Sequence, residues 1–333
     1  MAAPVRPPAG GTFTLARRVR RALKRVPVWA WRVLMHAVKK SEHARFNVDP
    51  VTGVDYHHDI DFVGDGIHAH RLDVISPPFS PAAGLHPVYV YFHGGGWTSG
   101  DKAALTKYCA SQAAGGIVVV NVNYRKAPRF HMRHVLEDAN AALEWVARNI
   151  RRYGGDPQRL VLGGDSAGGQ ISALLTASGL HAELAEHYAL RPAVAQRTIK
   201  GLVQHCSIVD FSVFFDRGFV LSLNFVRMLL PGGRRGRHGR AAALREASRF
   251  ISPIEWLDAR FPPVFLTTSE RDYFYGANLN FIDRLRRHQV PTRTLIYGWE
   301  NANTEHTWQQ DYRFPESQEV YRQLQDFVHD VAG

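Results

Sequence analysis

Residues 160–170 read LVLGGDSAGGQ, and this stretch decides the fold. An apolar run leads into a segment in which four glycines surround one hydroxyl, that of Ser166. Glycine costs conformational entropy on folding, so this concentration needs a reason. One reason is a sharp strand-to-helix turn that exposes the serine hydroxyl, as in G-x-S-x-G sequences. An ordinary glycine-rich loop is the alternative, and the rest of the chain must decide between the two.

Apolar strand patterns alternate with amphipathic helical patterns on both sides of this stretch. The helical patterns include residues 135–150, 277–290 and 316–331. The alternation predicts an α/β fold with a mostly parallel, doubly wound sheet and helices on both faces. The expected strands are residues 54–63, 68–77, 88–92, 116–124, 159–165, 199–210, 262–272 and 292–299.

A basic N-terminal arm carries almost all of the net charge of +11. Residues 1–41 hold ten Lys or Arg and no acidic residue, so the remainder has a charge of only +1. The length of 333 residues fits one α/β domain with an insertion. We expect an arm at 1–50 and a catalytic domain at 51–333, whose insertion covers about 211–250.

The cysteine content and the apolar segments indicate the cellular compartment and whether the chain could span a membrane. Cys109 and Cys206 are the only cysteines, too far apart in sequence to indicate a disulfide framework or a zinc site. We expect both to fill the core, in a reducing, cytoplasmic compartment. Residues 28–38 are apolar apart from Arg32 and His36, but as a helix they would reach only about 16 Å, against roughly 30 Å for a bilayer core.

Four chemically unusual segments follow expected strands. Ser166 follows one strand, the sequence HGGGW (93–97) follows another, and Asp272 and His306 follow two more. Ligands of open α/β sheets bind beyond the carboxyl ends of the strands, so these segments are expected to meet. A serine hydroxyl needs a base to become a nucleophile, and a carboxylate can orient that base. Glycines in HGGGW would let backbone N–H groups approach a developing oxyanion.

The sequences HGGGW, NYRKAP (123–128) and GDSAGG (164–169), followed by an Asp and then a His, resemble the hormone-sensitive-lipase family of α/β-hydrolases. The resemblance covers about residues 86–330. It implies an eight-stranded α/β-hydrolase fold with a helical cap and no metal or other cofactor. It also implies esterase or lipase activity. The site residues it implies are Ser166 as nucleophile, Asp272 as acid, His306 as base, and Gly95, Gly96 and Ala167 as oxyanion-hole donors.

The sequence departs from the family pattern in two places. The family usually has a glutamate after YR-x-AP, whereas this chain has Arg129. The loop before the base, ENANTEHTW (300–308), is also long and polar. We therefore expect the hydrogen bonding of the loop that contains Arg129 to differ from that of the family.

Several other residues at the strand ends allow more than one interpretation. Asp210 competes with Asp272 for the acid, because it also follows a strand. His93 is expected to support the glycine-rich loop, and Asp165 to accept hydrogen bonds that hold it. Trp97 either lines an acyl pocket or packs in the core.

These observations favour a serine carboxylic-ester hydrolase that acts through an acyl-enzyme on short- to medium-chain acyl or aryl esters. The alternatives are an amidase or N-deacetylase with the same triad and a non-catalytic small-molecule binder. The expected partner is a small-molecule or lipid ester. The basic arm is expected to act as a lid, to contact an anionic membrane, or both. No nucleic-acid motif accompanies the charge, and the sequence leaves a homodimer open.

Overall fold

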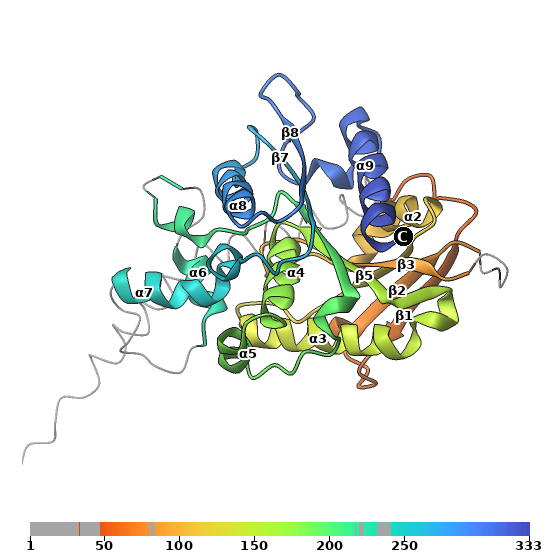
Figure 1. Ribbon diagram of the computed structural model, residues 1–333, viewed down its shortest axis with the longest axis horizontal. Coiled ribbons are helices and arrows are strands. Elements are labelled where there is room, and N and C mark those ends of the chain that lie inside the picture. The colour runs from red at the N-terminus through yellow and green to blue at the C-terminus, as the bar shows by residue number, and fades with distance from the viewer. Residues whose placement is uncertain are drawn as a thin grey trace, which may run out of the picture.

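An eight-stranded sheet forms the centre of the computed structural model, which describes residues 33, 47–78, 80, 84–216, 218–219, 223–231 and 241–333 (Figure 1). The strand order is β1-β2-β4-β3-β5-β6-β7-β8, with β2 antiparallel to both of its neighbours and all later pairs parallel. The strands are β1 (Asp55–Asp61), β2 (Arg71–Ser76), β3 (His86–Phe92), β4 (Val118–Val122), β5 (Gly155–Asp165), β6 (Ile199–His205), β7 (Val264–Ser269) and β8 (Thr292–Tyr297).

Helices cover both faces of the sheet, as the sequence predicts. Two separate apolar clusters show this: one joins the sheet to α3, α4 and α8, and the other joins it to α2 and α9. Figure 1 shows α2 and α9 side by side and α6 and α7 together at the opposite end of the molecule. The α-helices are α2 (Thr106–Ala114), α3 (Met132–Asn149), α4 (Ala167–Ser178), α5 (Ala182–Tyr188), α6 (Leu223–Leu229), α7 (Ala241–Ser248), α8 (Tyr275–Arg287) and α9 (Pro315–Ala332).

The eight expected strands all form, but several are shorter than their apolar patterns. The expected strand at 68–77 begins with a 3-10 turn, His68–His70, before β2. The strand expected at 199–210 ends at His205, and the one at 262–272 ends at Ser269. The residues beyond β7 include Asp272, which contacts His306.

The expected insertion is described in part. It contains a 3-10 segment, η6 (Phe211–Phe215), followed by α6 and α7. Residues 232–240 of the expected insertion and nearly all of the expected arm at 1–50 lie outside the described residues. Among the described residues, no helix combines the length and apolar character needed to cross a bilayer.

Candidate active site

Ser166 lies in a tight turn between β5 and α4. Its backbone has φ 50° and ψ −115°, a conformation that L residues rarely adopt. Its N–H donates to the carbonyl of His205 at 2.9 Å, and its carbonyl accepts from Ile208 N–H at 3.1 Å. These bonds to the neighbouring strand end hold the strained turn. The turn therefore has the strained strand-to-helix conformation expected around Ser166 rather than that of an ordinary loop.

Gly168 allows the first turn of α4 to pack directly on the end of β3. A Cβ atom at this position would overlap the carbonyl oxygen of Phe92 and crowd that of His93. Backbone atoms cannot move aside as a flexible side chain can. The glycine therefore permits the close approach that places Ser166 beside the glycine loop, defined as residues 93–96.

We expect Gly168→Ala to lower the free energy of unfolding by roughly 2–4 kcal/mol, because the new methyl group collides with backbone. Gly276→Ala is a matched control, since Gly276 is also in a helix and nothing lies within 4 Å of its would-be Cβ. This control should be neutral or stabilising by up to about 1 kcal/mol. Urea unfolding of both variants gives the comparison. Equal effects would contradict the packing argument.

Three predicted residues meet at the carboxyl ends of the strands. The His306 Nδ1 atom lies 2.7 Å from Asp272 Oδ1, and its Nε2 atom lies 3.0 Å from Ser166 Oγ. Asp272 follows β7, and His306 lies in the loop after β8. The long polar loop at 300–308 thus brings an imidazole between a carboxylate and a hydroxyl.

Neighbouring groups fix the orientation of the Asp272 carboxylate. Phe274 N–H donates to Oδ1 at 3.1 Å, and Thr268 Oγ1 donates to Oδ2 at 3.3 Å. The rings of Tyr273 and Phe274 lie 5.5 Å and 5.6 Å from the His306 ring. The carboxylate is buried, whereas the imidazole remains partly exposed. With a proton on Nδ1, the imidazole would donate to Asp272 and direct its Nε2 lone pair at Ser166.

Asp210, the competing acid, has other partners. It accepts from Ser212 N–H at 2.8 Å, at the start of η6, and from Asn280 Nδ2 at 2.8 Å. The structure therefore places Asp272 rather than Asp210 against His306.

The glycine loop is held by a buried carboxylate, that of Asp165. Gly94 N–H donates to its Oδ1 at 2.9 Å, Tyr91 OH donates to the same oxygen, and Gln310 Nε2 donates to Oδ2 at 2.9 Å. Burial raises the pKa of Asp165. These contacts confirm the expectation that Asp165 accepts hydrogen bonds from the loop. They attach the loop to the residue just before Ser166.

Gly95 and Gly96, two of the expected oxyanion-hole residues, adopt left-handed conformations with φ 111° and 56°. The Gly95 carbonyl accepts from Ser99 N–H at 3.1 Å and from Ser99 Oγ at 2.8 Å, which closes the loop on itself. Ala167, the third expected donor, is the first residue of α4. The first N–H groups of a helix have no partner within the helix, so Ala167 N–H suits an anionic oxygen.

His93 supports the loop from below. Burial lowers its pKa to about 3, so the imidazole is neutral at physiological pH. Its Nδ1 lies 2.6 Å from the Gly94 carbonyl, and its ring stacks on that of Tyr124 at 4.6 Å. Tyr124 OH in turn donates to the His93 carbonyl at 2.7 Å. The NYRKAP segment and the glycine loop are thereby joined.

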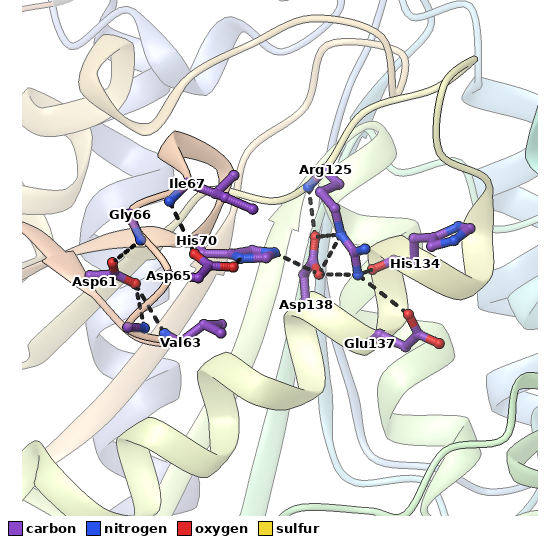
Figure 2. Close-up of polar contacts among 11 residues, drawn as sticks. Asp61, Val63, Asp65, Gly66, Ile67, His70, Arg125, His134, Glu137 and Asp138 are labelled. Carbon is purple, nitrogen blue, oxygen red and sulfur yellow. Dashed lines mark hydrogen bonds and ion pairs between the residues drawn. The ribbon is translucent and has the colours of Figure 1, made fainter.

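A polar network that the sequence analysis missed anchors the NYRKAP segment (Figure 2). The Arg125 backbone N–H and guanidinium both donate to the buried Asp138 of α3, at 2.8 Å each. His70 lies between two carboxylates, with Nδ1 2.7 Å from Asp65 and Nε2 3.2 Å from Asp138. Arg129, which replaces the family's usual glutamate, instead lies over the Phe130 ring at 5.4 Å. No local sequence pattern marks this network, because its members come from three separate segments.

Trp97 is fully buried and packs in the core. Its Nε1–H donates to Gln170 Oε1 at 2.6 Å, and its ring lies 5.8 Å from Phe211 and 6.5 Å from Phe214. The packing alternative therefore describes this residue. Through it, the glycine loop contacts the start of the insertion.

Comparisons with known proteins agree with this fold. The family model described as α/β-hydrolase fold matches residues 89–306. The chain is 28% identical over 258 residues to a probable carboxylic ester hydrolase, LipM, of Mycobacterium tuberculosis, covering 76% of this chain and 57% of LipM. It is 44% identical over 90 residues to the carboxylesterase NlhH of the same species, covering 27% of this chain and 28% of NlhH. The chain thus spans little more than half the length of LipM and less of NlhH.

The solved structure of esterase B from Lactobacillus rhamnosis has the same fold. The two superpose with a TM-score of 0.80 over 93% of this chain and 96% of that one, at 20% sequence identity. At this identity, the likeness concerns the fold alone.

Proposed function

This chain belongs to the α/β-hydrolase fold family, in its hormone-sensitive-lipase-like class, and from that premise we propose that it hydrolyses carboxylic esters. The observation that carries the proposal is the pair of contacts made by His306, 3.0 Å to Ser166 Oγ and 2.7 Å to Asp272 Oδ1. An imidazole in this position can move a proton to and from a serine hydroxyl. The curated relatives, which are named as ester hydrolases, support the same reaction class.

The first half-reaction forms an acyl-enzyme. Ser166 Oγ attacks the ester carbonyl carbon while His306 Nε2 takes the hydroxyl proton. Asp272 stabilises the resulting imidazolium and keeps Nδ1 protonated. His306 then gives the proton to the departing alkoxide, which leaves as the alcohol. Ser166 remains esterified to the acyl group.

The second half-reaction repeats the steps with water. His306 removes a proton from water, the hydroxide attacks the acyl-enzyme, and the proton returns to Ser166 as the acid leaves. In both halves, N–H groups of Gly95, Gly96 and Ala167 are proposed to stabilise the oxyanion. Losing one such donor typically costs about 10²–10³ in rate. The fixed loop conformation means that the donors need no reorganisation.

The apolar surroundings of His306 support a hydrophobic acyl group on the substrate. Phe274, next to His306, contacts Phe214 and Phe219 of the insertion at ring distances of 6.1 Å and 5.7 Å. The insertion thus brings aromatic side chains to the site. We propose a short- to medium-chain acyl or aryl ester as substrate, with the insertion and the basic arm as the cap. We also propose that the basic arm contacts an anionic lipid surface, because a lid that opens at such a surface would give a lipid ester access to the site.

We expect the protein to hydrolyse p-nitrophenyl butyrate with a kcat/KM at least about 100-fold above that for the matched butyryl p-nitroanilide. An amide leaving group needs more proton transfer than a phenolate. The measurement is a series of acetate, butyrate, octanoate and palmitate esters beside their anilides.

Each alternative has its own outcome in this series. Hydrolysis of the anilides at rates comparable to those of the matched esters would favour an amidase or N-deacetylase. Inertness toward every ester would favour the non-catalytic binder. Either result would overturn the proposed function.

A further inference from the structure

Cys206 lies directly behind the proposed triad. It follows β6 with φ 48°, and its side chain is fully buried. Gln309 Nε2 lies 3.5 Å from its Sγ atom and also donates to Thr267 Oγ1 at 2.7 Å, which fixes the amide beside the thiol. From the sequence, Cys206 was expected to fill the core, because the two cysteines are far apart in sequence and lie near apolar residues. In three dimensions, Asp272 and His306 are its neighbours.

These three residues together form a possible ligand set for a metal ion. One ligand atom each from Cys206, Asp272 and His306 lies within 4.8 Å of the others. Over the part of the chain that the structure describes, they are the only such group of His, Cys, Asp or Glu. Zinc takes sulfur at about 2.3 Å and nitrogen or carboxylate oxygen at about 2.0–2.2 Å in a tetrahedron. Ligand atoms of such a site lie about 3.3–3.7 Å apart, so small side-chain movements would suffice.

The charges of this set match a divalent ion. Zinc binds the thiolate form of cysteine, so the proton of the Cys206 thiol has to leave when the ion binds. Binding would form a Zn–S bond and release that proton to solvent. One thiolate and one carboxylate then neutralise the charge of the ion. His306 supplies the third ligand through Nδ1, the nitrogen that faces Asp272, and the ring proton moves to Nε2. The mixed sulfur, nitrogen and oxygen set favours zinc over magnesium or calcium.

We propose that Cys206, Asp272 and His306 form an inhibitory zinc site that overlaps the proposed triad. Zinc in this site occupies the imidazole and the carboxylate together. His306 can then no longer accept the Ser166 proton, so ester hydrolysis stops until the ion leaves. The His306 side chain is the partly exposed member of the three, so an ion would reach the group past it. The inhibitory effect rests on the proposed hydrolase function, whereas the binding itself does not.

The inhibition test compares three forms of the full chain in a zinc chloride titration of p-nitrophenyl butyrate hydrolysis. Cys206→Ser removes the proposed sulfur ligand. Cys109→Ser is the matched control, because Cys109 is equally buried but lies in α2 and is not part of the group formed by Cys206, Asp272 and His306. Each form is compared with its own rate without zinc, and a chelator should restore that rate. We expect the wild type and Cys109→Ser to share one half-inhibiting concentration, and Cys206→Ser to need at least about 100-fold more zinc.

A spectroscopic test detects metal binding independently of ester hydrolysis. Cobalt(II) titrated into the Ser166→Ala protein should give a thiolate-to-cobalt charge-transfer band and the intense visible bands of a tetrahedral site. Adding Cys206→Ala to that protein should abolish the charge-transfer band, and adding Cys109→Ala should leave it. Circular dichroism checks that each variant is folded.

Two results would overturn the proposal: equal zinc inhibition of wild type and Cys206→Ser, or absence of the cobalt–thiolate band from the Ser166→Ala protein. If the band appears but no ester is hydrolysed, then the proposed function fails while the metal site stands.

Discussion

Ser166→Ala is expected to lower kcat on p-nitrophenyl butyrate by roughly 10⁴- to 10⁶-fold, to the residual rate that binding and oxyanion stabilisation alone provide. The reason is that the substitution removes the attacking oxygen and leaves His306 without a proton to accept. The turn itself should survive, because its hydrogen bonds to His205 and Ile208 use only the backbone of Ser166. Thermal unfolding should therefore change little.

A second serine of the same segment provides the matched control. Ser172 is buried in α4, where its Oγ donates to the Gly169 carbonyl at 2.9 Å and accepts from Gln204 Nε2 at 3.0 Å. Ser172→Ala should cost about 1–2 kcal/mol of stability and leave kcat within a few-fold. A fluorophosphonate should label the wild type and Ser172→Ala once each, and peptide mass should locate the adduct at Ser166. An adduct elsewhere, or activity that survives Ser166→Ala, would refute the proposed nucleophile.

The sequence predicts the centre of the sheet well because the parallel strands there are buried on both faces. Such strands appear as uninterrupted apolar runs, and β3, β4 and β7 are buried along nearly their entire lengths. The residues that follow them must gather at one edge of the sheet, since parallel strands share one direction. This explains why Ser166, Asp272 and His306, distant in sequence, could be predicted to meet.

What the sequence did not predict depends on contacts between distant segments. The His70–Asp138–Arg125 network joins residues whose partners are 68 and 13 positions away. Nothing in a linear pattern selects those pairs over others. Helix α2 was missed because its apolar residues, such as Tyr108 and Cys109, are mixed with small and polar ones. Cys206 was interpreted correctly as buried, but its position beside Asp272 depends on how β6 and β7 pair.

Asp272→Asn is expected to reduce kcat by about 10⁴-fold with little change in KM. Asparagine keeps the size of the side chain but cannot stabilise the imidazolium as a charge. Its amide N–H can also donate a hydrogen bond to Nδ1, and this would favour the tautomer with the ring proton on Nε2. The Nε2 atom would then point an N–H rather than a lone pair at Ser166, and the base would be lost. The effect is confined to kcat because the positive charge on His306 develops only during the reaction.

Asp210→Asn distinguishes this explanation from a general effect of removing a buried carboxylate at a strand end. Asp210 and Asp272 are similarly buried, and each accepts from a backbone N–H two residues later, but only Asp272 contacts His306. Asp210→Asn should therefore lower stability modestly, by about 1–2 kcal/mol, and change kcat by less than about tenfold. Initial rates over a full substrate range, beside urea unfolding of both variants, give the comparison. A larger loss of kcat in Asp210→Asn than in Asp272→Asn would reverse the assignment. Replacing the carboxylate that orients His306 by an amide should cause the larger loss of activity.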